Sequence, residues 1–366
     1  MNENELSIEE DTLNELVNLK NNDGFENKSW DEWIKYALKI NSKTNVKEII
    51  ENVEKKFFDD NHFERYVKNF TLNLEQITKQ SSSRELDPEY NNKKPQIKSA
   101  IVIGRGPSIK KHNHLDILSK SNFGGYIVCT DGALIQTLKA GVTPDKFPNF
   151  IVVTVDTEED EVNFFSDEIV DQYGEKIHGI FSTLVDPSVI KRAINAKIKI
   201  HWTHPLFDFQ EGIKSFNNIS ALIVRAKKNG VGLPALQTGG NVGTSSWFVS
   251  WQILKCKTIA LIGINHGWEE DDSWETILSH GNVISTPNID KNSETFKKLF
   301  PKIYNPDFKS YCILDPIFQY YSNALKEFIF RSPEDIETIN ATEGGSIFGK
   351  RITSMAFKDF LGKHQN

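Results

Sequence analysis

Short apolar runs of strand length recur between residues 97 and 265, and small or polar residues follow them. The runs lie at residues 101–103, 126–129, 150–155 and 258–264, and the strand-length segments 179–183 and 198–202 include polar residues as well. Continuous apolar runs of this length predict strands that are buried on both faces. The segments between them have helical spacing, which predicts a parallel sheet with right-handed crossovers. We therefore expect an α/β fold with helices on both faces of an open, mostly parallel sheet.

The first 95 residues have a different pattern, with apolar positions at helical spacing and a single glycine. This predicts three or four amphipathic helices, the last near residues 46–57. Trp30 and Trp33 stand three residues apart and would share one helical face. They could pack on the main domain or form a surface for a partner or for self-association.

These patterns predict five regions. An N-terminal helical region is expected over residues 1–80 and a polar linker over 81–96. The Rossmann-like core follows over 97–265, and an irregular excursion or lid over 266–316. The last region, 317–366, would complete the core with helices at 317–330 and 353–361.

Composition narrows the functional classes. The chain has 366 residues, a formal charge of -7 and a pI near 5.8, which argues against nucleic-acid binding because phosphates require a basic face. No apolar run approaches the roughly 20 residues that span a bilayer, and the acidic N-terminus does not resemble a signal peptide. Cys129, Cys256 and Cys312 are few and far apart, so we expect buried thiols in a reducing compartment. A cytoplasmic protein without membrane contact is the expectation.

The first predicted strand ends in a glycine-rich turn, residues 104–108. Gly104 and Gly106 would let the backbone approach a phosphate or ribose, and free N–H groups in such a turn bind anions. Arg105 could add a charge and Ser108 a hydroxyl. The turn lacks the ending of a P-loop, and Pro107 breaks the dinucleotide fingerprint. A plain tight turn is the alternative.

Carboxylates provide a sharper signal. Asp131 and Asp156 each follow the end of a predicted strand, so they can converge at one edge of the sheet. Asp145 stands in a Pro-Asp turn after a helical segment. Carboxylates placed in this way suit Mg²⁺ with its phosphate and water ligands. The alternative is that each one caps a helix or turn. The acidic run at residues 158–161 could extend the site or form a solvated face.

A second glycine-rich segment precedes an apolar helix. Exposed N–H groups and the helix dipole would make an anion site there. Close packing of helix and sheet is the alternative, with Asn241 or Thr244 as the cap. The predicted anion-binding residues are Thr238, Gly239, Gly240, Asn241, Gly243 and Thr244.

Histidines and a late glycine pair complete the candidates. His201 and His204 stand at a strand end, where His204 could act as a general acid or base, or simply form a structural hydrogen bond. His266 follows another strand and is comparable. Thr342, Glu343 and Gly344 could close over the site as a lid or turn the chain.

In their order, these motifs resemble the MptE-like domain. That domain occurs in archaeal 6-hydroxymethylpterin pyrophosphokinases and in motility-associated-factor (Maf) proteins, which are implicated in glycosylating flagellin with nonulosonic acids. The resemblance covers about residues 97–265, and residues 340–349 extend it toward Maf proteins. Residues 131–133 with Asp145 and Asp156 are also similar to thiamine pyrophosphokinases. The matching motifs are residues 104–108, 130–133, 141–145, 155–156, 238–244 and 261–263.

The chain departs from these patterns at three places. Asn265 replaces the family's Asp after the strand at 258–264. Residues 157–159 read Thr-Glu-Glu where pyrophosphokinases often have a further Asp. Residues 201–206 hold offset histidines and lack the Gly-Asp-Asn of the archaeal enzymes.

The resemblance implies a Mg²⁺-dependent transferase, most directly one that moves diphosphate from ATP to a hydroxymethylpterin-like acceptor. Asp131, Asp156 and Asp145 would hold Mg²⁺, while the turn at 104–108 would hold phosphate or ribose. The first alternative is a Maf-like glycosyltransferase that uses a CMP-activated nonulosonic acid, with His204 or His201 as base. The second is a degenerate nucleotide-binding or scaffold protein.

Overall fold

The computed structural model describes residues 10–22, 27–34, 62–206, 210–211, 214–215, 232–280 and 292–364. The chain divides into two compact units, Met1–Asn52 and Val53–Asn366. Three predicted segments fall wholly or partly outside the described residues. They are the helix over 46–57, residues 216–231 of the expected core, and residues 281–291 of the excursion.

The first unit contains helix α1 (Glu10–Asn22) and a helical turn at residues 30–34. The rings of Trp30 and Trp33 lie edge to face with their centroids 5.5 Å apart. The ammonium group of Lys20, in the last turn of α1, lies 5.3 Å from the centroid of the Trp30 ring. The prediction that the two indoles lie on the same side of one turn is therefore confirmed.

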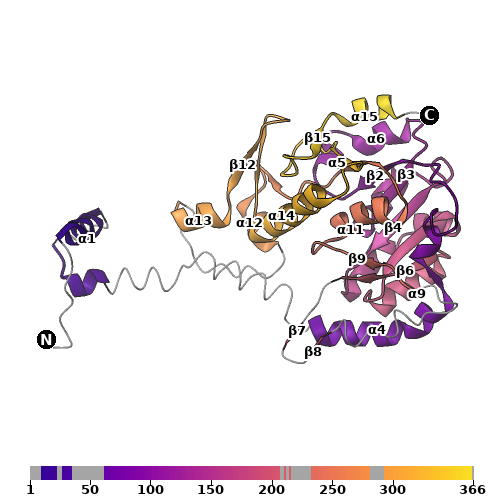
Figure 1. Cartoon of the computed structure of the whole chain (residues 1–366), viewed down its shortest axis with the longest axis horizontal. Helices are drawn as coiled ribbons and strands as arrows, with labels where there is room; N and C mark the ends of the chain where they lie inside the picture. Colours follow the sequence, from indigo (N-terminus) through magenta and orange to yellow (C-terminus); the bar gives the residue numbers. More distant parts are fainter. Residues whose placement is uncertain are drawn as a thin grey trace. The chain divides into compact units, whose positions relative to one another are not determined.

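The second unit is built on one large sheet, to which ten strands of the described residues belong (Figure 1). Its order is β1-β6-β5-β4-β3-β2-β10-β14-β15, and β9 pairs with β6. All of these pairings are parallel, which confirms the predicted α/β class. The strands are β1 (Ser81–Ser82), β2 (Ser99–Ile103), β3 (Tyr126–Thr130), β4 (Phe150–Thr154), β5 (His178–Ser182), β6 (Lys199–Pro205), β9 (Ala235–Leu236), β10 (Thr258–Ile262), β14 (Glu337–Asn340) and β15 (Ile352–Ser354).

Helices cover both faces of this sheet, as the apolar runs predict. Side chains alternate along each strand, so Ile101 and Ile103 belong to one core and Ala100 and Val102 to the other. The first core is covered by α4 (His62–Lys79), α5 (Ser108–Lys111), α6 (His114–Ser119), α7 (Leu134–Lys139), α8 (Glu168–Tyr173), α9 (Pro187–Asn195) and α15 (Phe357–Lys363). The second is covered by α11 (Val242–Phe248), its π-helical continuation η6 (Val249–Ile253) and α14 (Pro316–Arg331).

The strand order reverses direction beside β2. From β2 the chain adds β3, β4, β5 and β6 in turn on one side, and later places β10, β14 and β15 on the other. Ile101 of β2 therefore pairs with Ile127 of β3 on one side and with Ala260 of β10 on the other. Loops that follow strands on the two sides of such a point diverge and leave a crevice at the carboxyl edge.

The remaining elements lie around this core. The stretch expected as a linker contains β1 and the 3-10 helix η1 (Ser83–Leu86), and β1 joins the main sheet. Residues 266–316 contain a three-stranded antiparallel sheet in the order β11-β13-β12. Further elements outside the main sheet are β7 (Gln210–Glu211), β8 (Lys214–Ser215), η4 (Gly174–Lys176), β11 (Trp268–Glu269), α12 (Trp274–Ser279), α13 (Glu294–Leu299), β12 (Lys302–Asn305) and β13 (Ser310–Ile313).

The cysteines and the helix lengths agree with what composition predicts. Cys129, Cys256 and Cys312 are buried free thiols, as predicted. Within the described ranges, every helix is too short or too polar to cross a bilayer.

Candidate active site

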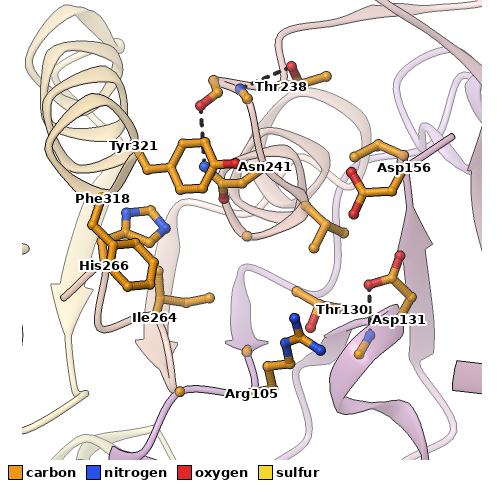
Figure 2. Close-up of a pocket in the computed structure, with 18 of the residues that line it drawn as sticks. Arg105, Thr130, Asp131, Asp156, Thr238, Asn241, Ile264, His266, Phe318 and Tyr321 are labelled. Carbon is orange, nitrogen blue, oxygen red and sulfur yellow. Dashed lines mark hydrogen bonds between the residues drawn. The ribbon is translucent and has the colours of Figure 1, made fainter. Parts of the chain in front are cut away.

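A pocket of about 870 Å³ opens at the carboxyl edge of the sheet, where the strand order reverses (Figure 2). The loops after β2, β3, β4 and β10 line it, together with the start of α11 and part of α14. It therefore gathers segments that are more than two hundred residues apart in the chain, from the loop after β2 to α14. The predicted site residues that line it are Gly104, Arg105, Gly106, Asp131, Asp156, Thr238, Gly239, Gly240, Asn241 and Gly243.

Three carboxyl groups converge on one side of this pocket, and we call them the carboxylate cluster: Asp131, Asp156 and Glu161. Asp131 opens the 3-10 helix η2 (Asp131–Ala133) directly after β3, and Asp156 follows β4 by two residues. Glu161 lies in the 3-10 helix η3 (Glu159–Phe165). One carboxylate oxygen from each lies within 4.8 Å of the other two. Figure 2 shows Asp131 and Asp156 facing the open centre of the pocket.

The cluster is electrostatically strained. Burial raises the pKa of Asp131 to about 6, and burial with the charge of Asp131 raises the pKa of Asp156 to about 8. Burial and the charges of both aspartates raise the pKa of Glu161 to about 9. The Oδ2 atom of Asp131 and the Oε2 atom of Glu161 are buried without a hydrogen-bond partner in the described part of the chain. Mutually repelling carboxyls with unused oxygens are a ligand set that fits a divalent cation.

The floor of the pocket is glycine backbone from the loops after β2 and β10. The N–H group of Gly104 donates to Ile262 O, and that of Gly106 donates to Gly263 O, both at 2.9 Å. A Cβ atom at Gly104 would lie 2.4 Å from Gly263 O, and Gly263 itself has φ of +66°. The glycines therefore allow two loops to touch. Their N–H groups are engaged in pairing those loops, whereas the sequence suggested that they would be free for an anion.

A third side is the start of α11. Gly239 and Gly240 take left-handed φ values of +55° and +80°, which turn the chain into the helix. The N–H group of Gly240 donates to Thr238 Oγ1 at 3.2 Å, and Asn241 Oδ1 caps the helix by accepting from Thr244 N at 2.8 Å. Asn241 is thus a helix cap, as the alternative interpretation predicted. Asn241 also lines the pocket. Thr238 and Asn241 stand above the open centre in Figure 2.

Opposite the carboxylates lies an aromatic wall, which we define as His266, Phe318 and Tyr321. The ring of His266 stacks near Phe318 with centroids 6.4 Å apart and lies 5.8 Å from the ring of Tyr321. Phe318 and Tyr321 project from α14 into the view of Figure 2. Burial lowers the pKa of His266 to about 3, so its ring is neutral at physiological pH. The wall offers flat, uncharged surface to a ligand ring.

Asp145 does not join the carboxylate cluster. It is exposed and forms an ion pair with Lys176. Its turn follows α7, which runs back from the carboxyl edge of β3, and precedes β4. Asp145 therefore lies near the amino end of β4, and its prediction as a metal ligand does not agree with this position.

The predicted strand-end histidines also lie outside the pocket lining. His204 is buried, with its Nδ1 atom 2.8 Å from Thr183 Oγ1 and its ring 6.1 Å from that of Phe70. His201 Nε2 lies 2.9 Å from His178 Nδ1. β6 is separated from β3 by β4 and β5, so its carboxyl end is remote from the point where the strand order reverses. The structure supports the structural interpretation of His204.

Other predicted contacts are used inside the protein. Ser108 Oγ donates to Asn265 Oδ1 at 2.8 Å, and the buried Thr244 is part of the α11 cap. Thr342 Oγ1 donates to Leu261 O at 3.2 Å. Glu343 accepts from Phe357 N at 3.1 Å, and Gly344 O accepts from Asn340 Nδ2 at 3.4 Å. These hydrogen bonds hold the ends of strands and α15 in place. The predicted phosphate contact of Ser108 and the predicted lid at 342–344 therefore do not agree with the structure.

The sequence pattern did not single out several lining residues. Phe318 and Tyr321 are spaced i and i+3 on a predicted helix, a signal that is also typical of ordinary core packing. His280 lines the pocket from the end of α12, where no motif surrounds it. Asp315 binds the His280 ring and caps α14. The Asp-Pro pair at 315–316 is a helix-start signal, but it does not reveal the contact with His280.

Comparison with known proteins shows which family model matches the chain and which solved structure is similar to it. A family model described as 6-hydroxymethylpterin diphosphokinase MptE-like matches residues 68–271, which is more than half of the chain. A similar solved structure is that of a Maf glycosyltransferase from Magnetospirillum magneticum AMB-1, with 14% identity and a TM-score of 0.48. The match covers 74% of this chain and 37% of that one, so the chain spans little more than a third of that protein's length. No curated protein matches the chain.

Proposed function

The chain belongs to the MptE-like family, and on that premise we propose that it is a transferase that moves diphosphate from ATP to a hydroxymethyl group on a flat, pterin-like acceptor. The observation that carries this proposal is the carboxylate cluster at the glycine-lined edge of the sheet. Transfer of a phosphoryl or diphosphoryl group needs positioning and charge stabilisation more than covalent help from the protein. A concave site with carboxylates at one side and glycine backbone below suits that task.

The cluster has the donor set for Mg²⁺. Magnesium prefers one or two carboxylates together with phosphate and water oxygens, and Asp131 and Asp156 would supply the former. Glu161 would supply a third carboxylate beside the same ion. The unpartnered oxygens of Asp131 and Glu161 are the atoms that lack another use. When bound, Mg²⁺ would neutralise charge on the phosphate oxygens and hold them in line for attack.

The two sides of the pocket suggest how the substrates divide it. The phosphate chain would lie toward the carboxylate cluster, with the backbone at Gly239, Gly240 and Gly243 beside it. The acceptor ring or the adenine would lie against the aromatic wall. Arg105 is an exposed residue of the pocket lining. Its positive charge acts to lower the pKa values of Asp131 and Asp156. In the complex this guanidinium would contact the α-phosphate, which leaves as part of AMP.

The reaction can be written with a complete balance. The acceptor oxygen loses its proton and forms a bond to the β-phosphorus of ATP. The bond between that phosphorus and the oxygen that bridges to the α-phosphorus breaks, and its electron pair stays on the departing AMP. The products are AMP and an acceptor diphosphate. AMP release therefore separates this reaction from simple hydrolysis to ADP.

The test is acceptor-dependent AMP formation. Wild-type protein, Mg²⁺, ATP and 6-hydroxymethyl-7,8-dihydropterin are incubated, and AMP is quantified by ion-exchange chromatography. We expect Asp131→Asn and Asp156→Asn to remove at least 99% of the rate, about 3 kcal/mol of transition-state stabilisation. Asp145→Asn is the matched control, since that exposed carboxylate lies outside the pocket lining, and it should retain the rate.

Two other results would redirect the assignment. Release of CMP from a CMP-activated nonulosonic acid, unaffected by Asp156→Asn, would replace the diphosphokinase with the glycosyltransferase alternative. Failure of ATP, CMP and CMP-sugars to raise the thermal stability of the wild-type protein would contradict both enzymatic functions and favour a scaffold.

A further inference from the structure

A buried carboxylate and a histidine form a dyad beside the aromatic wall. Asp315 is fully buried and accepts three hydrogen bonds from described residues. Its Oδ1 atom accepts from Phe318 N at 2.7 Å and so caps α14. Its Oδ2 atom accepts from Trp268 Nε1 at 2.8 Å and lies 2.5 Å from His280 Nδ1. One oxygen thus fixes a helix, and the other fixes two rings.

The histidine of this dyad is held at the pocket. His280 is one of the lining residues, and about a quarter of its side chain remains accessible. Its ring lies 4.6 Å from the ring of Phe318 and 5.2 Å from that of Trp268, measured between centroids. Contact with a carboxylate places the ring proton on Nδ1. Nε2 then carries the lone pair, and no hydrogen bond from the described residues engages it.

The other histidine of the pocket differs in each of these respects. His266 lies deep in the aromatic wall, and its Nδ1 atom is buried without a hydrogen-bond partner in the described ranges. No carboxylate among the described residues orients it, and burial disfavours its protonated form. His280 has an accessible ring, a fixed tautomer and an acid that can stabilise its positive charge. These are the properties of a base and its orienting group.

We propose that His280 is the general base of the transfer reaction and that Asp315 is its positioning residue, an inference that rests on the function proposed above. Nε2 takes the proton of the acceptor hydroxyl as the acceptor oxygen bonds to the β-phosphorus and AMP departs with the electron pair of the broken bond. The imidazolium is stabilised by Asp315 and later returns its proton to solvent. The acceptor hydroxymethyl group would accordingly lie at the end of the aromatic wall near His280.

The test compares His280→Gln and Asp315→Asn with a control, His112→Gln, whose ring lies outside the pocket lining. AMP formation and the Kd for a non-hydrolysable ATP analogue are measured for each variant. We expect His280→Gln to lower kcat by about 10²- to 10⁴-fold while the Kd changes by less than about threefold. In Asp315→Asn, Oδ1 can still cap α14, but the amide would donate to Nδ1 and move the ring proton to Nε2. That variant should lose kcat in the same way.

Long-range ¹⁵N–¹H correlation spectra add a readout that needs no substrate. The His280 signals, assigned by their loss in His280→Gln, should show an Nδ1-protonated ring in the wild type and an Nε2-protonated ring in Asp315→Asn. An Nε2-protonated wild-type ring overturns the proposal, as does a His280→Gln variant with at least a third of the wild-type kcat. A wild-type protein that releases no AMP overturns the proposed function itself and the base with it, which is a different result.

Discussion

Neutralising Asp156 should stabilise the metal-free protein while abolishing its activity. Its carboxylate oxygen lies within 4.8 Å of those of Asp131 and Glu161. At 4.8 Å and an effective dielectric constant of about 20, two unit charges repel by about 3 kcal/mol. Because the pKa of Asp156 is raised to about 8, its carboxyl escapes most of this repulsion at neutral pH by taking up a proton, and Asp156→Asn removes the stability cost of that protonation. Partial protonation of the cluster, solvent and the lost attraction to Arg105 reduce the gain, so we expect about 2 to 4 kcal/mol.

For a domain of this size, that gain corresponds to a Tm about 3 to 6 °C higher, measured by calorimetry without divalent metal. Adding Mg²⁺ should raise the Tm of the wild type by mass action and leave the variant unchanged. Asp145→Asn supplies a control of opposite sign, because it breaks an exposed ion pair and should lower stability by at most about 1 kcal/mol. A lower Tm for Asp156→Asn than for the wild type would refute the reasoning.

Three further predictions concern the fold. The pKa values of His204 and His266, about 4 and 3, lie below the ordinary value, so stability is lost as the pH falls below 6.5. Between pH 7 and pH 5, urea unfolding of His204→Gln should show a loss about 2 kcal/mol smaller than the wild type, and an equal loss would contradict this. Gly263→Ala should destabilise by about 3 kcal/mol in the same assay, whereas unchanged stability would mean that the loop contact yields. Ellman's reagent should label the native protein slowly and the unfolded protein fully, because the thiols of Cys129, Cys256 and Cys312 are buried and their pKa values are raised. Fast labelling of the native protein would count against that burial.

Much of the core could be predicted because hydrophobic burial leaves a direct trace in the sequence. The apolar runs mark β2 to β6 and β10, and the polar residues after β3 and β4 are the ones that meet in the pocket. The Asp-Pro pair at 186–187 starts α9, as its capping chemistry predicts. Local rules of this kind depend only on neighbouring residues.

The remaining features depend on strand order and side-chain direction, which a single sequence does not encode locally. Asp145 and Asp131 are both acidic residues near turns, yet they lie at opposite ends of strands. His204 lies at a strand end as predicted, one residue before the end of β6, but β6 lies too far along the sheet to reach the pocket. His280 and Asp315 are 35 positions apart and meet only after α12 and α14 have packed.

The touching loops after β2 and β10 have a consequence for how the pocket can change. Its floor consists of main chain at Gly104, Gly106 and Gly263, where any side chain would collide with the neighbouring loop. A substitution at these glycines cannot change which ligand is bound and can only disrupt the contact between the two loops. New specificity, whether selected or engineered, therefore has to come from the sides: from η3, from the start of α11, or from the pocket-lining positions of α14.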